Sequence, residues 1–286
     1  MRNLPDRIQK MHEGKWDKSA NGSKEVRGKT LGIVGYGKIG SQLSVIAEAM
    51  GMKVQFYDIE ERLALGNAQK CGTLSQLLST SDIVSLHVDG RPSNKLMMDD
   101  DEFKMMREGS IFINLSRGHV VNVDVLKSYV DSGKIRGLAV DVFPEEPLSN
   151  DDPFVSPLRN LPNTMLTPHV GGSTEEAQEN IADFVPGKII EYINTGSTSN
   201  SVNFPNITLP RLTDAHRFIH IHENTPGILA EIGNKLAEHG INIVGQYLKT
   251  NDKIGYVITD IDKNYEDDVI KELKIINGTI RFRVLY

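Results

Sequence analysis

The sequence is poor in cysteine: its 286 residues include only Cys71. A single cysteine cannot form a disulfide within the chain, which fits a reducing compartment and argues against a disulfide-stabilised secreted domain. No motif surrounds Cys71, so we expect a small buried or half-buried residue rather than a nucleophile.

Long apolar runs and basic tracts are also lacking. No apolar stretch is long enough to cross a bilayer, and the first residues do not follow the pattern of a signal peptide. The net charge is −6 and aromatic residues do not alternate with basic ones, so we expect no membrane and no nucleic-acid partner. With 39% hydrophobic and 24% charged residues, the composition is typical of a soluble, cytoplasmic protein of two domains.

A glycine-rich turn is the most informative feature that is present. Residues 31–34 form a short apolar run typical of a buried strand, and the G-x-G-x-x-G sequence from Gly35 to Gly40 follows directly. This turn opens a predicted helix to about Met50, and Asp58 ends a second apolar run about twenty residues further on. In this context the motif indicates a dinucleotide site, whereas a glycine turn without a ligand is the less favoured alternative.

The chemistry of the motif favours NAD as the cofactor. The first glycine permits a tight turn, the second lets the backbone approach a pyrophosphate, and the third lets the helix pack closely on the strand. The helix N-terminus attracts the phosphates. Asp58 can hydrogen-bond both hydroxyls of an adenosine ribose and would repel the 2′-phosphate of NADP. We expect cofactor contacts at Gly35, Gly37, Lys38, Ile39, Gly40 and Asp58.

Strands and helices are predicted to alternate between residues 31 and 167. The expected strands are 31–34, 54–57, 83–88, 111–115, 137–142 and 165–167. The expected helices are 39–50, 74–79, 100–106, 123–132 and 173–194. This α/β alternation predicts a doubly wound parallel sheet, covered by helices on both faces, with ligands bound at the carboxyl edge of its strands.

The C-terminal part has a different pattern. Residues 195–210 begin with a small polar run and contain two prolines, which indicates a linker. Strands over 217–222, 242–249, 255–261 and 279–285 and helices over 226–238 and 265–274 then predict a β-α-β-β-α-β, ferredoxin-like domain. We expect three parts: residues 1–172, 173–214 and 215–286.

Three polar residues follow different strands of the predicted sheet. Arg117 comes after 111–115, Glu146 lies beyond 137–142, and His169 comes after 165–167. A histidine can take a hydroxyl proton, a carboxylate can orient the imidazole, and an arginine can grip a substrate carboxylate with two hydrogen bonds. Taken singly, the three residues are better explained as a surface cation, a solvated turn residue and a satisfied loop histidine, respectively. Because all three occur in a chain that also carries a predicted NAD site, together they favour a catalytic role.

These segments resemble a known family. The glycine turn, S-R-G around Arg117, D-V-F-P-E-E-P from Asp141 to Pro147 and T-P-H-V-G-G around His169 resemble the NAD-dependent D-2-hydroxyacid dehydrogenases. The H-I-H-E-N-T-P-G run from His220, with I-N-I around Asn242, resembles the ACT domain of the short bacterial and fungal D-3-phosphoglycerate dehydrogenases. The resemblance extends from near Arg2 to the C-terminus.

The resemblance implies roles for particular residues. Arg117 would bind the substrate carboxylate, His169 would act as acid and base, Glu146 would pair with it, and Asp141 would lie near the nicotinamide amide. The implied reaction oxidises 3-phosphoglycerate to 3-phosphohydroxypyruvate and leads into L-serine biosynthesis. The implied effector is L-serine, bound between two copies of the ACT domain in a homo-oligomer by His222, Asn224 and Asn242. No metal is expected. Another 2-hydroxyacid substrate, and a non-catalytic protein that binds NAD and serine, remain alternatives.

The resemblance also predicts that a substrate lobe precedes this chain. The family begins with such a lobe, and residues 1–27 match part of the helix that links it to the NAD domain. The lobe holds the substrate phosphate, so we expect weak or no turnover by these residues alone. The apolar stripe on the helix after His169 should then be partly exposed; it consists of Ile181, Phe184, Val185, Ile189, Tyr192 and Ile193.

Overall fold

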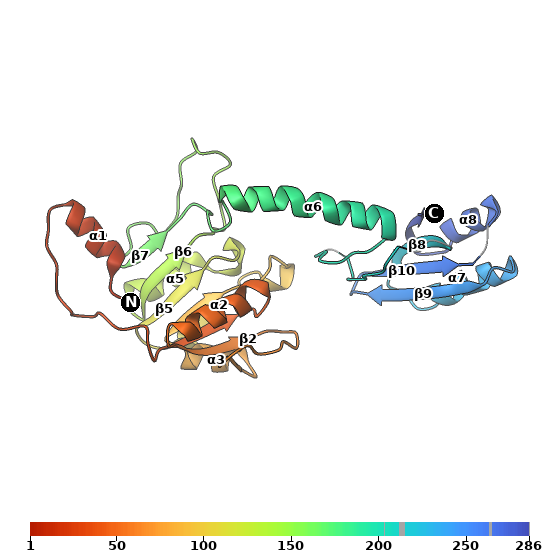
Figure 1. Cartoon of the computed structure of the whole chain (residues 1–286). Helices are drawn as coiled ribbons and strands as arrows, with labels where there is room; N and C mark the ends of the chain where they lie inside the picture. The colour runs from red at the N-terminus through yellow and green to blue at the C-terminus, as the bar shows by residue number, and fades with distance from the viewer. Residues whose placement is uncertain (203, 212–214, 263–264, 286) are drawn as a thin grey trace. The chain divides into compact units, whose positions relative to one another are not determined.

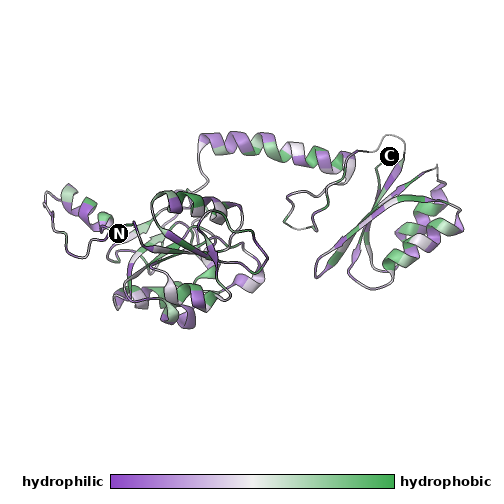
Figure 2. Ribbon diagram, turned by 60° about the horizontal axis from the view of Figure 1, so that its bottom comes forward, coloured by the Kyte–Doolittle hydropathy of each residue, from purple (hydrophilic) through white to green (hydrophobic). Residues whose placement is uncertain are grey.

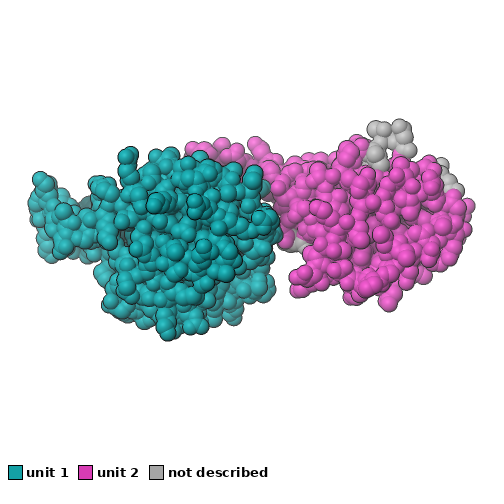
Figure 3. Space-filling view, turned by 90° about the horizontal axis from the view of Figure 1, so that it is seen from below, with its two compact units in different colours: residues 1–174 teal, residues 175–286 magenta. Residues whose placement is uncertain are grey.

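The computed structural model describes residues 1–202, 204–211, 215–262 and 265–285. The chain forms two compact units, Met1–Thr174 and Glu175–Tyr286 (Figure 3), and each is described by itself. Asp214, where the expected linker part ends, and Tyr286, the last residue of the expected third part, lie outside the described residues.

The first unit is built on a parallel sheet with the strand order β3-β2-β1-β4-β5-β6-β7 (Figure 1). Its strands are β1 (Thr30–Val34), β2 (Lys53–Tyr57), β3 (Gln69–Lys70), β4 (Ile83–Leu86), β5 (Ser110–Asn114), β6 (Ile135–Val140) and β7 (Thr164–Leu166). Every strand expected in this region is present. The sequence did not predict β3, because its two polar residues form no apolar run. The strand order reverses at β1, which places the glycine turn at the switch point of the sheet.

Helices cover both faces of this sheet, as predicted. They are α1 (Leu4–His12), α2 (Lys38–Ala49), α3 (Leu74–Thr80), α4 (Asp100–Met105) and α5 (Val123–Asp131), with the short 3-10 turns η1 (Pro92–Asn94) and η2 (Gly118–Val120). Leu77 of α3, Phe103 of α4 and Leu126 of α5 belong to the apolar core on one face. Ala47 of α2 packs with Phe56 of β2 on the other face.

The expected helix over residues 1–27 is correct only for α1. The helix ends at His12 because Gly14 takes a φ of 76°, a left-handed conformation that terminates helices. A polar stretch without helical periodicity follows up to β1. Asp6 holds α1 on the sheet, since its Oδ1 accepts the backbone N–H of Asn163 at 2.7 Å.

The second unit contains an antiparallel sheet with the strand order β11-β8-β10-β9. Its elements are α6 (Glu175–Thr195), β8 (His216–Glu223), α7 (Ile228–Glu238), β9 (Ile243–Thr250), β10 (Ile254–Ile261), α8 (Asp267–Lys274) and β11 (Thr279–Val284). Leu236 of α7 and Leu273 of α8 pack with Phe218 and Val257 on one face of the sheet. The predicted ferredoxin-like order of strands and helices is therefore present.

The segment after α6 packs against the other face of this sheet, whereas the sequence indicated an open linker. Ser197 and Thr198 are buried, and Ile207 joins Ile219 and Tyr256 in an apolar cluster. Gly196 lies so close to the sheet that a Cβ there would sit 2.7 Å from Ile219 Cδ1. The small polar residues therefore allow close packing here rather than flexibility.

Arg217 joins both ends of this segment to the sheet. Its side chain is 1% exposed, and it donates two hydrogen bonds to the Asp260 carboxylate, at 2.6 and 2.8 Å. Its Nη1 also donates to the carbonyl oxygens of Thr195 and Pro210, both at 2.9 Å. The end of α6, the segment and the sheet are thus bonded through one buried guanidinium.

The apolar side chains of α6 are largely exposed, as predicted. Figure 2 shows apolar and polar residues along the whole length of this helix. The exposed side chains of the expected stripe are Ile181, Phe184, Val185, Ile189 and Ile193, each between 43% and 53%. Tyr192 is half-buried beneath the guanidinium of Arg283, whose Cζ lies 4.8 Å from the ring centre. None of the helices in the described ranges combines the length and the hydrophobicity that a membrane crossing requires.

Candidate active site

The three glycines of the turn after β1 occupy different surroundings. Gly35 has a φ of 90°, and a Cβ there would lie 2.5 Å from the carbonyl oxygen of His87. A Cβ on Gly40 would overlap the carbonyl oxygen of Gly35, so this position holds α2 against the turn. A Cβ on Gly37 would meet nothing within 4 Å among the described residues. The space beside Gly37 is therefore open to a ligand.

The start of α2 suits an anion. Gly37 is the N-cap residue and supplies no side-chain hydrogen bond to the first turn of the helix. Lys38 and Ile39, which the sequence indicated as cofactor contacts, are the first two residues of α2, and Ile39 is 70% exposed. A phosphate placed beside Gly37 would lie at the positive end of the helix dipole.

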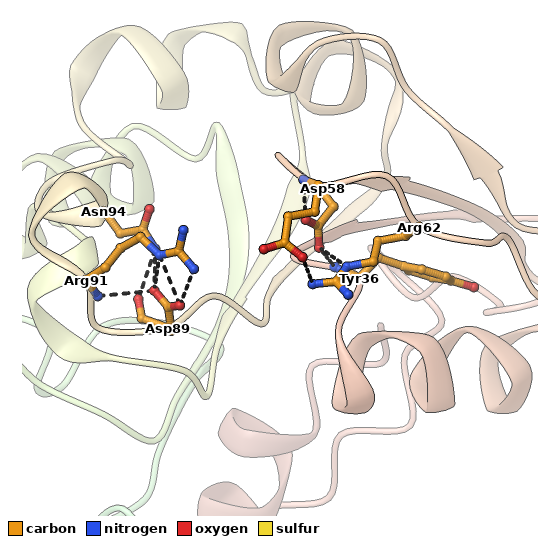
Figure 4. Close-up of polar contacts among 7 residues, drawn as sticks. Tyr36, Asp58, Arg62, Asp89, Arg91 and Asn94 are labelled. Atoms are coloured by element: carbon orange, nitrogen blue, oxygen red, sulfur yellow. Dashed lines mark hydrogen bonds and ion pairs between the residues drawn. The ribbon is translucent and has the colours of Figure 1, made fainter. Parts of the chain in front are cut away.

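Asp58, the first residue after β2, is fixed beside the same turn. Its Oδ2 accepts the backbone N–H of Tyr36 at 2.7 Å, and its Oδ1 accepts the backbone N–H of Glu60 at 2.9 Å. Arg62 also approaches, with its Nε 3.6 Å from Oδ2 (Figure 4). An acidic side chain held at this place fits the ribose of a dinucleotide, and the open space at Gly37 fits its pyrophosphate.

His169 and Glu146 are in direct contact. The Nδ1 of His169 lies 2.9 Å from Oε2 of Glu146, and the other carboxylate oxygen accepts the backbone N–H of Phe143 at 2.9 Å. Burial raises the pKa of Glu146, but the hydrogen bonds from His169 and Phe143 outweigh it and hold that pKa below its ordinary value. The carboxylate is therefore ionised at neutral pH. It orients the imidazole and leaves Nε2 for proton exchange with a substrate.

Arg117 faces the same cavity as this pair. The cavity has a volume of about 270 Å³, and Arg117, Glu146 and His169 all line it. Asn114, the last residue of β5, fixes the loop because its Nδ2 donates to the Arg117 carbonyl oxygen at 3.0 Å. The three residues come from loops after β5, β6 and β7, so the structure brings together the catalytic set expected from the sequence.

Comparison with known families agrees with this geometry. The model of the D-isomer specific 2-hydroxyacid dehydrogenase, NAD binding domain, matches residues 1–171, more than half of the chain. The chain belongs to the D-isomer specific 2-hydroxyacid dehydrogenase family. A second model, the AHAS small subunit-like ACT domain, matches residues 218–281 of this dehydrogenase.

Individual relatives are similar over the whole chain. The D-3-phosphoglycerate dehydrogenase of Haemophilus influenzae is 52% identical over 286 residues, which are 100% of this chain and 70% of the relative. The D-3-phosphoglycerate dehydrogenase of Escherichia coli K12 is 51% identical, again over 100% of this chain and 70% of the relative. The NAD-dependent formate dehydrogenase of Staphylococcus aureus in complex with NAD superposes with a TM-score of 0.62 at 27% identity, over 74% of this chain and 62% of that chain.

Asp141 holds the loop that carries His169 in the dehydrogenase. Its Oδ1 accepts from the Thr167 hydroxyl at 2.5 Å and from the Val170 N–H at 3.0 Å, and its Oδ2 accepts from the Gly171 N–H at 2.9 Å. Burial raises the pKa of Asp141, but these three hydrogen bonds outweigh that effect and hold the pKa below its ordinary value. Asp141 therefore positions the residues on both sides of His169.

The three residues expected to bind an effector do not meet within one chain. His222 and Asn224 lie at the end of β8 that pairs with Ile254, whereas Asn242 precedes β9 at the opposite end of the sheet, near Ile261. His222 is 3% exposed, and its buried Nε2 has no hydrogen-bond partner among the described residues. The Nδ2 of Asn224 donates to the Asn251 carbonyl oxygen at 2.9 Å, and that of Asn242 donates to Oδ2 of Asp262 at 3.3 Å.

Sequence reasoning missed the loop that follows β4. Asp89, Arg91 and Asn94 form a hydrogen-bonded cluster there, at the same edge of the sheet as the catalytic residues. The available signal was the D-G-R sequence directly after the apolar run 83–88, where ligand-binding groups gather in sheets of this class.

Proposed function

We propose that this dehydrogenase oxidises 3-phosphoglycerate to 3-phosphohydroxypyruvate with NAD⁺ and that L-serine inhibits it through the ACT domain. The observation that carries the substrate is the 52% identity, across the whole chain, to a D-3-phosphoglycerate dehydrogenase. The 2.9 Å contact between His169 and Glu146 supports hydroxyl oxidation as the reaction. We place the protein in the cytoplasm, in the pathway to L-serine.

The chemistry follows from the positions of three side chains. Arg117 holds the substrate carboxylate with two hydrogen bonds, because a guanidinium matches the geometry of a carboxylate. His169 takes the proton of the C2 hydroxyl at Nε2, while Glu146 stabilises the imidazolium through Nδ1. Bound NAD⁺ supplies the hydride acceptor.

The cofactor contacts are proposed on the turn geometry. The pyrophosphate lies beside Gly37 and the start of α2, at Lys38 and Ile39, and Asp58 binds the ribose. Asp141 lies next to His169 and is proposed to face the nicotinamide end. Gly35 and Gly40 shape the turn.

The effector site is proposed to form between two copies of the ACT domain. Within one chain, His222 and Asn224 lie at one end of the sheet and Asn242 at the other. A two-fold axis perpendicular to the sheet would place the first end of one sheet beside the second end of its partner. The amide side chains then offer donors and acceptors to the ammonium and carboxylate of serine.

The reaction is tested by single-turnover oxidation of NADH with 3-phosphohydroxypyruvate. His169→Ala is expected to abolish turnover and to leave the affinity for NADH unchanged, and His12→Ala, on the exposed face of α1, serves as the control. Glu146→Gln is expected to slow turnover by about 10²–10⁴-fold. Turnover by His169→Ala at the wild-type rate would refute the assignment.

A panel of 2-oxo acids tests the substrate. Faster reduction of another member than of 3-phosphohydroxypyruvate would assign the protein to a different 2-hydroxyacid substrate. Binding of NADH and serine with no turnover of any member would instead favour a non-catalytic binding protein.

Serine binding is tested by calorimetry and sedimentation. L-serine is expected to bind the wild type and to favour a dimer, and D-serine serves as the control ligand. Asn224→Ala and Asn242→Ala are each expected to weaken binding, although the two residues lie far apart in one chain. Binding of serine to a species that stays monomeric would refute the proposed interface.

A further inference from the structure

The loop after β4 carries an arginine whose position is fixed by several hydrogen bonds. Arg91 Nε lies 2.8 and 3.0 Å from the two carboxylate oxygens of Asp89, and its Nη2 lies 2.6 Å from Oδ2 (Figure 4). Asn94 Nδ2 donates to the Asp89 carbonyl oxygen at 3.0 Å and to Oδ1 at 3.1 Å. The Arg91 and Asp89 side chains are 44% and 55% exposed, and exposed ion pairs add little to stability. Stability alone therefore gives little reason for this arrangement.

The loop runs along the edge of the sheet between the glycine turn and the catalytic residues. At one end, a Cβ on Gly35 would lie 3.2 Å from Val88 Cγ1. Further along, a Cβ on Gly90 would lie 3.3 Å from His119 Cε1 and 3.6 Å from Arg117 Cγ. Asp89, Arg91 and Asn94 therefore lie at the ligand-binding edge of the sheet, after the strand that flanks β1 on the side opposite β2.

The charges of this loop are matched to those of its surroundings. The hydrogen bond to Asp89 raises the pKa of Arg91 most, burial opposes it, and the negative charges of Glu60 and Asp58 raise it further. Arg91 thus lies within electrostatic reach of the loop after β2 that holds the expected ribose ligand. Figure 4 shows the two clusters, one around Asp58 after β2 and one around Asp89 after β4, the two strands that flank β1 in the sheet.

The glycine turn after β1 lies between the loops that follow β2 and β4. With the pyrophosphate at this turn and the ribose at Asp58 after β2, a base that extends from that ribose across the end of β1 reaches the loop after β4. The charge of Arg91 is already paired with Asp89, but the two flat faces of a guanidinium stay available for stacking. We propose that Arg91 is a cofactor-binding residue whose guanidinium, held flat by Asp89, packs against the adenine of NAD.

This proposal adds one residue to the proposed NAD site and rests on that site. It assigns to Asp89 the role of a positioning residue, because its carboxylate fixes the guanidinium plane without touching the base. Stacking against the adenine concerns only the adenosine half of the cofactor. The affinity for that half should therefore depend on Arg91, whereas the affinity for the nicotinamide half should not.

The test is a set of fluorescence and competition titrations of the full chain with NADH, ADP-ribose and reduced nicotinamide mononucleotide. Arg91→Ala is expected to weaken NADH and ADP-ribose by about three- to tenfold, the range for a stacked guanidinium at a partly exposed site, and to leave the mononucleotide unchanged. Arg91→Lys and Asp89→Asn are expected to weaken ADP-ribose similarly, because each removes the fixed flat group.

Arg107→Ala provides the matched control. Arg107 forms an ion pair with Asp82 at 3.1 Å and is 51% exposed, but it lies before β5, at the opposite edge of the sheet. This variant should bind NADH and ADP-ribose like the wild type.

Three results would overturn the proposal. Unchanged ADP-ribose affinity in Arg91→Ala would make Arg91 an ordinary surface ion pair. If Arg91→Lys binds ADP-ribose like the wild type and Arg91→Ala shows a salt-sensitive loss of affinity, the Arg91 side chain contacts a phosphate of the cofactor rather than the adenine. A wild-type chain that binds neither NADH nor ADP-ribose would refute the NAD site itself, which separates the two failures.

Discussion

The glycine turn after β1 allows protein stability and cofactor binding to be separated by two small substitutions. A methyl group at Gly37 meets no described atom within 4 Å, and the backbone there is extended, with a φ of −78°. Gly37→Ala should therefore change the free energy of unfolding by no more than about 1 kcal/mol, because alanine restricts the unfolded chain but is a poorer N-cap residue of α2 than glycine. The same methyl group occupies the space proposed for the pyrophosphate, so the affinity for NADH should fall at least about tenfold.

Gly40→Ala is the matched comparison. Its methyl group would overlap the backbone carbonyl oxygen of Gly35 and approach Ile33 Cγ2 to 3.0 Å. The backbone of the turn would have to shift to accept it. Such overpacking is expected to lower the free energy of unfolding by about 1–3 kcal/mol. Urea denaturation and NADH fluorescence titration of both variants provide the measurements. A Gly37→Ala variant that binds NADH like the wild type, or that is destabilised as much as Gly40→Ala, would refute this division of roles.

Three further predictions concern buried ionisable groups. Arg217→Met leaves Asp260 buried without its partner and should destabilise the second unit by about 3–5 kcal/mol in urea denaturation, whereas Lys271→Met, which breaks an exposed pair with Asp268, should change little. Burial and the nearby His222 lower the pKa of His220 from 6.5 to about 4, so the unfolded chain binds the additional proton between these pH values. Stability should therefore fall by about 3 kcal/mol as the pH drops from 6.5 to 4, and a His220→Gln variant that loses stability just as steeply would contradict this origin. Asp141→Asn should cost about 1–3 kcal/mol at neutral pH. Because the folded-state pKa of Asp141 is lowered, the difference from the wild type should shrink as the pH falls below about 4; a constant difference would show that the charge is not involved.

The sequence predicted the parts of this protein whose signals are local. The apolar runs, the glycine spacing and the position of Asp58 are enough to predict the parallel sheet and its ligand-binding edge. The contact between His169 and Glu146 was also accessible, because residues after neighbouring parallel strands meet at the same edge of the sheet.

Other features depend on contacts that no local pattern encodes. The run 196–201 has the composition of a linker. Its glycine and its small hydroxyl-bearing residues nevertheless allow it to pack closely on β8 and β10. From the sequence Arg217 looks like a surface residue, but in the structure it is buried and hydrogen-bonded to Asp260 and Thr195, which are far from it in the sequence. Asn242 and His222 lie at opposite ends of the sheet because of how β8, β9 and β10 pair. The order of strands and helices along the sequence does not specify which residues pair.

The proposed reaction and the proposed role of Arg91 both require that NAD binds at the turn from Gly35 to Gly40 and at Asp58. Isothermal titration of the folded chain with NADH tests it most directly. We expect one saturable site per chain, weakened by Gly37→Ala and by Asp58→Ala in variants that still unfold cooperatively. Titration without binding heat at several temperatures, to a protein whose unfolding transition is cooperative, would contradict it.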